Sequence, residues 1–140
     1  MKQTNRLIFV LSLLGIATAI YVLQSFLRHS SIICFTGGCE AVRKSPSSYL
    51  FGIFPVPAVG LIGYICLTLI SFLKTIRDKP LYDKLLFGIA LFGVCFVTWF
   101  TYTEIFIIHA ICTWYLLSTL NMIAIFLILT FSHISKLVNK

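Results

Sequence analysis

Residues 7–27 contain no charged side chain, and three later stretches of similar length contain no acidic residue, lysine or arginine. A helix needs roughly 20 apolar residues to cross a hydrocarbon core about 30 Å thick. We therefore predict four membrane-spanning helices, at residues 7–27, 56–73, 85–103 and 105–132. The expected fold is an all-α integral membrane domain, a four-helix bundle formed by the whole chain.

The composition supports this fold and argues against nucleic acid as a partner. Hydrophobic residues make up 59% of the chain, charged residues only 11%, and the mean hydropathy is +1.01. A soluble domain of this size needs more charge to cover its surface. The formal net charge is +7, but the basic residues stand between the apolar stretches and not along a polar face. We therefore attribute this charge to membrane topology.

Lysine and arginine are distributed unequally between the two predicted sides of the membrane. Eight of the 11 flank the first and last helices or lie in residues 74–84, whereas three lie in the first loop, residues 28–55. Loops rich in these residues stay in the cytoplasm. We therefore expect a multi-pass protein of the cell (inner) membrane, with both termini cytoplasmic and residues 28–55 outside. The eight residues are Lys2, Arg6, Lys74, Arg77, Lys79, Lys84, Lys136 and Lys140.

The first apolar stretch has a second interpretation, as a secretory signal peptide. Residues 17–19, Ala-Thr-Ala, resemble a cleavage site with small residues. The apolar run is longer than a usual signal core, and it continues past this site through Leu23. We therefore favour a retained membrane helix.

The outer loop contains a short apolar stretch after Pro46. Ser45 is a suitable helix N-cap, and proline is favoured at the first helical position. We predict a short helix here that lies at the membrane interface and partly covers the bundle. Gly60 and Gly63 follow in the second membrane helix, where we expect them to allow close contact with another helix.

Two of the five cysteines, Cys34 and Cys39, lie in the outer loop, where an oxidising compartment permits disulfides. Four residues separate them, and two of these are glycine, so the turn is able to close. A purely structural disulfide is one interpretation, but cross-linking so short a loop stabilises little. We therefore favour a reactive pair. Cys66 and Cys95 lie well inside membrane helices, and we interpret them as small buried hydrophobic residues.

The third and fourth helices are expected to be antiparallel neighbours, because the connection near Glu104 has almost no length. Counted from residue 105 at 1.5 Å per residue, Cys112 lies roughly 10 Å below the outer surface. His109, three residues earlier, would share its helix face. A nearby imidazolium favours the thiolate, which is the reacting form of cysteine. The alternative is that His109 is an ordinary polar residue at the interface.

Aromatic side chains are concentrated at the same depth as Cys112. An aromatic belt at the membrane interface is one explanation. A binding site for a lipid-soluble ring such as a quinone is another, because such a ring stacks on aromatic side chains. The two explanations are compatible. The residues are Phe96, Trp99, Phe100, Tyr102, Phe106, Trp114 and Tyr115.

These residues together resemble the vitamin K epoxide reductase family, most closely its small bacterial members without a fused thioredoxin-like domain. In the outer loop, the likeness rests on Cys34 and Cys39, with Val42 three residues and Ser45 six residues after the second cysteine. It continues through residues 108–118, which contain Cys112. It covers nearly the whole chain, and the combination is specific.

The resemblance implies a quinone-dependent, disulfide-forming oxidoreductase. A thioredoxin-like periplasmic or extracellular protein would pass electrons to Cys34 and Cys39, which would relay them to the thiols beside the quinone. The quinone, of the ubiquinone, menaquinone or vitamin K type, would accept the electrons, and no metal is implied. The catalytic residues would be Cys34, Cys39 and Cys112. The quinone would contact Tyr115, Trp114, Trp99, Phe96 and Tyr102, and His109 would support the thiolate.

The chain departs from the family pattern at two places. Residues 52–55, Gly-Ile-Phe-Pro, have one residue more than the family's Gly-x-Pro, and the second departure is the serious one. The family has a Cys-x-x-Cys pair beside the quinone, and the second position of that pair is Tyr115 here. Tyrosine cannot take part in disulfide exchange. Four explanations stay open: Cys112 alone reacts with the quinone, the chain is a catalytically silent homologue, the sequence is modified or misread at this position, or Cys95 replaces the missing thiol.

Three functions therefore compete. The first is the quinone-linked oxidoreductase, which would support disulfide formation outside the cytoplasm. The second is a silent homologue that binds quinone or the thioredoxin-like partner. The third is a small transporter, which usually needs a charged residue facing the bundle interior. We rank the transporter last, because the available residue, Glu104, is expected at a helix end.

Overall fold

The computed structural model describes residues 2–28, 38–46, 49–50 and 52–139. Four long helices and three small elements make up this part of the chain. The long helices are α1 (Lys2–Arg28), α3 (Val56–Ile76), α4 (Pro80–Thr103) and α5 (Thr113–Val138). The small elements are a helix α2 (Cys39–Lys44), a strand pair β1 (Tyr49–Leu50) and β2 (Phe54–Pro55), and a π-helical turn η2 (Glu104–Ile108).

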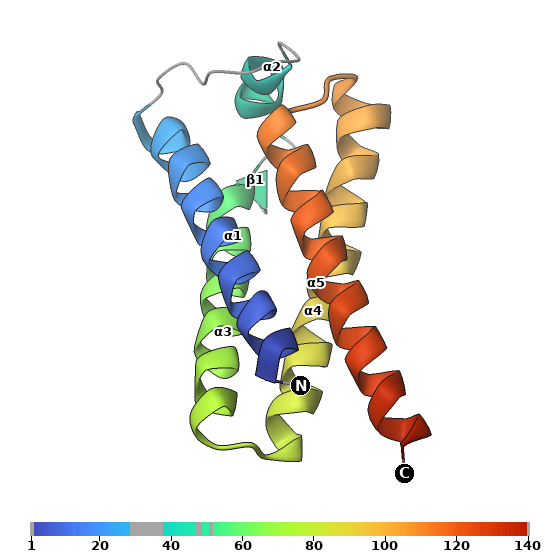
Figure 1. The fold of residues 1–140 in the computed structure, drawn as a ribbon. Helices are drawn as coiled ribbons and strands as arrows, with labels where there is room; N and C mark the ends of the chain where they lie inside the picture. The colour runs from blue at the N-terminus through green and yellow to red at the C-terminus, as the bar shows by residue number, and fades with distance from the viewer. Residues whose placement is uncertain (1, 29–37, 47–48, 51, 140) are drawn as a thin grey trace.

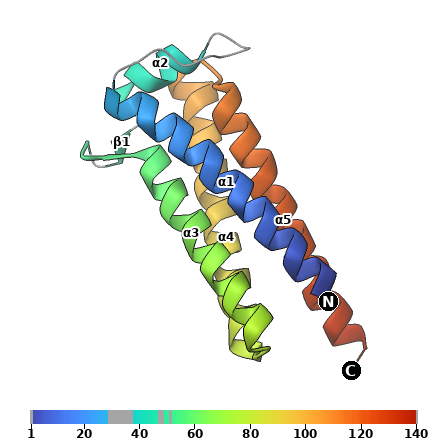
Figure 2. The same ribbon diagram turned by 60° about the vertical axis from the view of Figure 1, so that its left-hand side comes forward.

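The long helices form one bundle (Figures 1 and 2). Helix α1 packs against α3 and α5, and α4 packs against the same two helices. Helices α4 and α5 are antiparallel neighbours, as the sequence predicted. Helix α2 lies across one end, which we call the α2 end. Both termini and the α3–α4 connection lie at the opposite end, which we call the terminus end (Figure 1).

All four long helices are long and apolar enough to cross a membrane, α4 being counted together with η2 as Pro80–Ile108. This confirms the predicted number of apolar helices within the described part of the chain. Their outer surfaces carry large exposed apolar side chains, such as Leu14, Phe92 and Phe131. Soluble monomers rarely expose apolar patches of this extent. The fold therefore fits a multi-pass membrane protein.

The predicted fourth helix, residues 105–132, begins too early. In the structure, α5 starts at Thr113, and residues 104–112 form a connection. The turn η2 ends at His109, whose φ of 57° places it in the left-handed region, and the Ala110 N–H donates to the Glu104 carbonyl at 3.1 Å. This turn stops the helix, so Cys112 lies at the start of α5 and not two turns inside a helix.

The helix predicted after Ser45 is not confirmed, and its expected N-cap is wrong. Pro46 lies in a 3₁₀ turn, residues 47 and 48 lie outside the described residues, and Tyr49–Leu50 form a strand. Ser45 ends α2 instead of starting a helix, and its N–H donates to the Val42 carbonyl. Proline commonly follows a helix end because it cannot continue the helix, and Pro46 stands there. Beyond it the chain forms the antiparallel pair β1–β2, turned at Gly52 with a φ of 73°. The interfacial position of the outer-loop helix stays a prediction.

Polar side chains join the helices at the terminus end. The Asn5 amide donates to the Ser71 carbonyl at 2.9 Å and to the Thr75 hydroxyl at 2.6 Å, which connects α1 to α3. Asp83 of α4 forms ion pairs with Lys74 of α3 and Lys136 of α5. These contacts hold the ends of all four long helices together, with the apolar core above them. The core residues are Ile8, Tyr64, Leu67, Leu86, Ala90, Met122, Ile125 and Leu129.

Close helix contact depends on Gly15, not on the glycines that the sequence suggested. A Cβ added at Gly60 or Gly63 would meet no atom within 4 Å, so the predicted contact there is wrong. A Cβ at Gly15 of α1 would lie 2.3 Å from the Tyr64 ring. The Tyr64 hydroxyl donates to the Ser118 carbonyl at 3.0 Å, so this ring links α1, α3 and α5.

Replacing Gly15 with alanine is expected to destabilise the bundle by about 1–3 kcal/mol, because the buried Tyr64 ring must move. Gly60→Ala is the matched control, and we expect it to leave stability unchanged or slightly higher, since alanine favours a helix over glycine. Titration of purified protein with sodium dodecyl sulfate, followed by circular dichroism, measures both. An equal loss in the two variants would contradict this role of Gly15.

Candidate functional site

Cys112 occupies the N-cap position of α5 and is only 1% exposed. The first N–H groups of a helix have no partner within the helix, and they favour a negative charge placed against them. The backbone N–H groups of Trp114 and Tyr115 face the Cys112 sulfur. The fold therefore places this thiol where a helix terminus supports its thiolate.

Burial nevertheless dominates and raises the pKa of the Cys112 thiol above its usual range. The N–H groups of Tyr115 and Trp114 oppose this increase, and the negative charge of Glu104 adds to it. The imidazolium expected beside Cys112 is not on its helix face. His109 lies in the left-handed turn before α5, and its side chain is exposed. Support of the Cys112 thiolate by His109 stays a prediction. It was based on a shared helix face, and the two residues do not lie in one helix.

Glu104 is a buried carboxyl group next to Cys112. It is 2% exposed, and the Cys112 N–H donates to its carboxylate. Its Oε1 atom has no hydrogen-bond partner in the described structure. From the sequence, Glu104 was expected only at a helix end, although it is the only acidic residue in residues 85–132. That isolation within an apolar stretch is the sequence signal that marks it as a candidate functional residue.

Helix α2 packs directly on the segment that carries Cys112. A Cβ added at Gly38 would lie 2.4 Å from the Ile111 carbonyl oxygen, so the two backbones are in contact. Val42, in the last turn of α2, is fully buried and forms one apolar cluster with Cys112, Val56 and Phe100. Val42 thus packs α2 against the segment that carries the Cys112 thiol.

Of the two loop cysteines, the structure describes only the backbone of Cys39. Cys39 is the first residue of α2, next to Gly38, while Cys112 is next to Ile111. The Gly38–Ile111 contact therefore brings the backbone at Cys39 close to the backbone at Cys112. The side chain of Cys39 and all of Cys34 lie outside the described residues.

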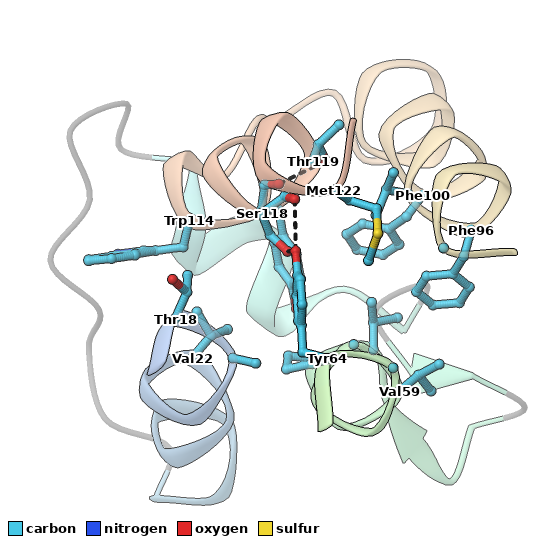
Figure 3. Close-up of a pocket in the computed structure, with 18 of the residues that line it drawn as sticks. Thr18, Val22, Val59, Tyr64, Phe96, Phe100, Trp114, Ser118, Thr119 and Met122 are labelled. Carbon is cyan, nitrogen blue, oxygen red and sulfur yellow. Dashed lines mark hydrogen bonds between the residues drawn. The ribbon is translucent and has the colours of Figure 1, made fainter. Parts of the chain in front are cut away.

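An apolar cavity of about 80 Å³ lies between the helices below this cluster. Figure 3 shows Tyr64 of α3 reaching across to Ser118 of α5, with Phe96 and Phe100 on the α4 side. Tyr115, Trp114, Phe100 and Val56 belong both to the pocket lining and to the Cys112 cluster. The thiol and the pocket therefore share a wall.

The aromatic residues predicted to contact a quinone divide into two groups. Phe96, Trp114 and Tyr115 line the pocket. Trp99 and Tyr102 do not belong to its lining, and their side chains are 47% and 57% exposed. The outward position of these two fits the alternative explanation, an aromatic belt at the membrane interface.

One polar atom stands out beside the pocket. The Thr18 and Thr119 hydroxyls donate to backbone carbonyls of their own helices, and the Tyr64 hydroxyl is used by Ser118. The buried Tyr115 hydroxyl has no partner in the part of the chain that the structure describes. Its ring packs on Phe100 with 4.8 Å between centroids. A flat apolar ligand with one hydrogen-bond acceptor would suit the chemistry of these walls.

The side chain of Cys95 is exposed on α4, and it belongs neither to the Cys112 cluster nor to the pocket lining. Its interpretation as a buried residue is therefore wrong, and its orientation does not support the suggestion that it replaces the missing thiol. Cys66 is partly buried on α3. Within the described ranges, no three His, Cys, Asp or Glu side chains are grouped to hold a metal ion.

The chain matches the sequence model of the vitamin K epoxide reductase family over residues 6–130. It belongs to this family. The match confirms the resemblance that the cysteine loop and the Cys112 segment indicated. Members of the vitamin K epoxide reductase family are, in general, quinone-linked thiol oxidoreductases. None of the curated proteins compared with the chain matches it significantly.

Alkylation of Cys112 is expected to depend on pH in a way that reports its surroundings. Because burial and Glu104 raise the pKa of this thiol, its thiolate fraction at pH 7 should be smaller than that of N-acetylcysteine. In a variant with Cys112 as its only cysteine, the rate of reaction with iodoacetamide should rise with pH. The pH at the midpoint of this rise should lie above the midpoint for N-acetylcysteine. Glu104→Gln should lower this midpoint. A midpoint at or below that of N-acetylcysteine would contradict the expectation.

Proposed function

We propose that the protein is a quinone-dependent oxidoreductase that oxidises the thiols of a thioredoxin-like protein and so supports disulfide formation outside the cytoplasm. One observation carries this proposal: Cys112 shares a wall with an aromatic pocket, and α2 packs on the segment that carries it. Family membership supplies the class of chemistry. The contacts suggest how this chain would carry it out.

The electron path begins at Cys34 and Cys39. A partner dithiol reduces their disulfide by exchange and is itself oxidised to a disulfide. In the next step the thiols of Cys39 and Cys112 form a disulfide, and the quinone gains two electrons and two protons to become the quinol. The Cys34 thiol then attacks the Cys39–Cys112 disulfide, which restores the Cys34–Cys39 disulfide and releases the Cys112 thiol. This cycle balances with three cysteines and needs no thiol at Tyr115.

Two groups beside Cys112 would serve the step that reduces the quinone. The Glu104 carboxylate, which accepts the Cys112 N–H, would receive the thiol proton. The buried Tyr115 hydroxyl would donate a hydrogen bond to a quinone carbonyl and so gain the partner that it lacks in the described structure. The quinone ring, of the ubiquinone, menaquinone or vitamin K type, would lie against Phe96 and Trp114.

The same proposal assigns an orientation in the cell (inner) membrane. The terminus end carries most of the lysine and arginine, whereas the described part of the α2 end carries few. Cytoplasmic loops are rich in these residues. The terminus end therefore faces the cytoplasm, and the site at the α2 end faces outward, where a periplasmic or extracellular partner reaches it.

Purified protein with dithiothreitol as donor and a soluble quinone as acceptor tests the function. We expect the unmodified protein to turn over and Tyr115→Cys to change the rate less than tenfold, because the three-cysteine path needs no thiol at position 115 and the substitution removes a single hydrogen bond to the quinone. In aerobic membranes, mass-tag alkylation should reveal a Cys34–Cys39 or Cys39–Cys112 disulfide. A protein with every thiol reduced under these conditions would not follow this mechanism.

The catalytically silent homologue is the second candidate, and Tyr115 is the observation that favours it. A silent protein would bind quinone or a thioredoxin-like partner through the same surfaces without turnover. In the assay above it would show no quinone reduction as it stands and would gain activity in Tyr115→Cys. The two candidates therefore predict opposite results from one substitution.

A further inference from the structure

A cleft at the terminus end of the bundle, far from Cys112, is lined by basic side chains. It has a volume of about 240 Å³ and lies between α1, the last turn of α3 and the last turns of α5. The N-terminus of α1 lies beside the lower ends of the other helices in Figure 1. The lining residues are Lys2, Asn5, Arg6, Lys74, Thr75, Asp78 and Lys136.

The cleft has a surplus of positive charge. Four cations and one carboxylate line it, and Asp83, which pairs with Lys74 and Lys136, adds a second carboxylate at its edge. The balance is therefore four positive against two negative charges, or +2. In the described structure, no carboxylate forms an ion pair with Lys2 or Arg6, and both are exposed. These two cations are available for an anion.

The positions of these groups are held by a network of hydrogen bonds beneath the cleft. The Asn5 amide is used by the Ser71 carbonyl and the Thr75 hydroxyl, and the Ser71 hydroxyl donates back to Asn5. This network fixes the start of α1 against α3. Helix α1 also begins at Lys2, so its unpaired first N–H groups add positive potential at the same place.

The position of the cleft identifies the class of anion. It lies at the terminus end, where α1 begins and α3 and α5 end (Figure 1), and lipid headgroups meet a membrane protein at the ends of its membrane-spanning helices. Basic pockets between membrane helices on the cytoplasmic side bind anionic lipid headgroups. We propose that this cleft is a phosphate-binding site for the headgroup of an anionic phospholipid. The bound headgroup would link α1, α3 and α5. This inference does not depend on the proposed redox function.

The test compares two double substitutions that remove the same charge. Lys2→Gln with Arg6→Gln removes the two unpaired cations of the cleft. Lys79→Gln with Lys84→Gln removes two exposed cations near the same end that do not line it. Each protein is placed in phosphatidylcholine nanodiscs with increasing phosphatidylglycerol, and native mass spectrometry counts the retained phosphatidylglycerol.

We expect the phosphatidylglycerol fraction for half occupancy to rise roughly tenfold to thirtyfold in the cleft variant, since each of the two cations near the surface contributes a factor of about three to five. The control variant should change less than threefold. An equal loss in both variants would show attraction to general surface charge and overturn the site. In pure phosphatidylcholine with millimolar inorganic phosphate, native mass spectrometry should show no phosphate retained by the protein. If phosphate were retained as well as phosphatidylglycerol is, the cleft would be a site for free phosphate and the assignment to a lipid would be overturned.

Discussion

Cys112→Ser is expected to lower the rate of quinone reduction by roughly a thousandfold or more, because a hydroxyl replaces a reacting thiol. Serine forms no disulfide with Cys39 and passes no electron pair to the quinone. Serine is also a favoured N-cap residue, so the start of α5 at Thr113 should be preserved. The loss of activity should therefore occur without a loss of folded protein. The assay with dithiothreitol and soluble quinone measures the rate, and circular dichroism in detergent measures the fold.

The matched control for this substitution is Cys95→Ser. Cys95 is exposed on α4 and belongs neither to the Cys112 cluster nor to the pocket lining, so its replacement should leave the rate unchanged. If Cys112→Ser kept more than a tenth of the activity, the Cys39–Cys112 step would be wrong. If Cys95→Ser removed the activity, the Cys95 thiol would have to take part in electron transfer, which would contradict the three-cysteine path.

Gly38→Ala is expected to slow quinone reduction by about a hundredfold. The added Cβ would lie 2.4 Å from the Ile111 carbonyl oxygen and 2.9 Å from its backbone nitrogen, and backbone atoms cannot move aside as a flexible side chain does. The start of α2 must then lift away from the segment before Cys112. A displacement of about 1 Å between reacting groups is enough to cost a factor of this size.

The effect of Gly38→Ala should be confined to the step between the loop and Cys112. Mass-tag alkylation after aerobic oxidation should show less Cys39–Cys112 disulfide, while Cys34–Cys39 disulfide stays abundant. Gly88→Ala on α4 serves as the control, because a Cβ there meets no atom within 4 Å. A rate for Gly38→Ala within threefold of the unmodified protein would mean that the α2 contact does not position Cys39.

The two substitutions and the phospholipid test address opposite ends of the bundle. The redox proposal depends on contacts at the α2 end, through Gly38, Val42 and Cys112. The lipid proposal depends on Lys2 and Arg6 at the terminus end. The cleft variant should therefore keep its quinone reductase activity in detergent, where no anionic phospholipid is present. The failure of one proposal would leave the other intact.

The sequence alone determined the number of apolar helices, the antiparallel pairing of α4 and α5, and the family. The helices were readable because only an uninterrupted apolar run of about 20 residues can cross a bilayer. The family was readable because Cys39, Val42 and Cys112 stand at characteristic spacings. These features depend on composition and on order along the chain, so no tertiary contact is needed to see them.

Only the tertiary structure decided where helices end and which faces meet. Ser45 ends α2, and His109 turns the chain before α5, because each adopts a backbone geometry set by its neighbours. The sequence does not reveal which side of a helix faces the bundle core, for another reason. In a membrane bundle the lipid-facing and core-facing sides are both apolar, so hydrophobic periodicity does not separate them. Phe96 lines the pocket and Trp99 is exposed, although both are large aromatic residues of one helix.

The same reason explains Glu104 and the glycines. Gly15, not Gly60, allows the close contact, because the Tyr64 ring happens to cross α1 at that residue. Glu104 stood out in the sequence as a lone carboxylate, but its role depends on the turn that brings it against Cys112. The sequence thus determined which reactive groups the chain contains. Packing among nearly uniform apolar surfaces decided that Cys112, Glu104 and Tyr115 share one site.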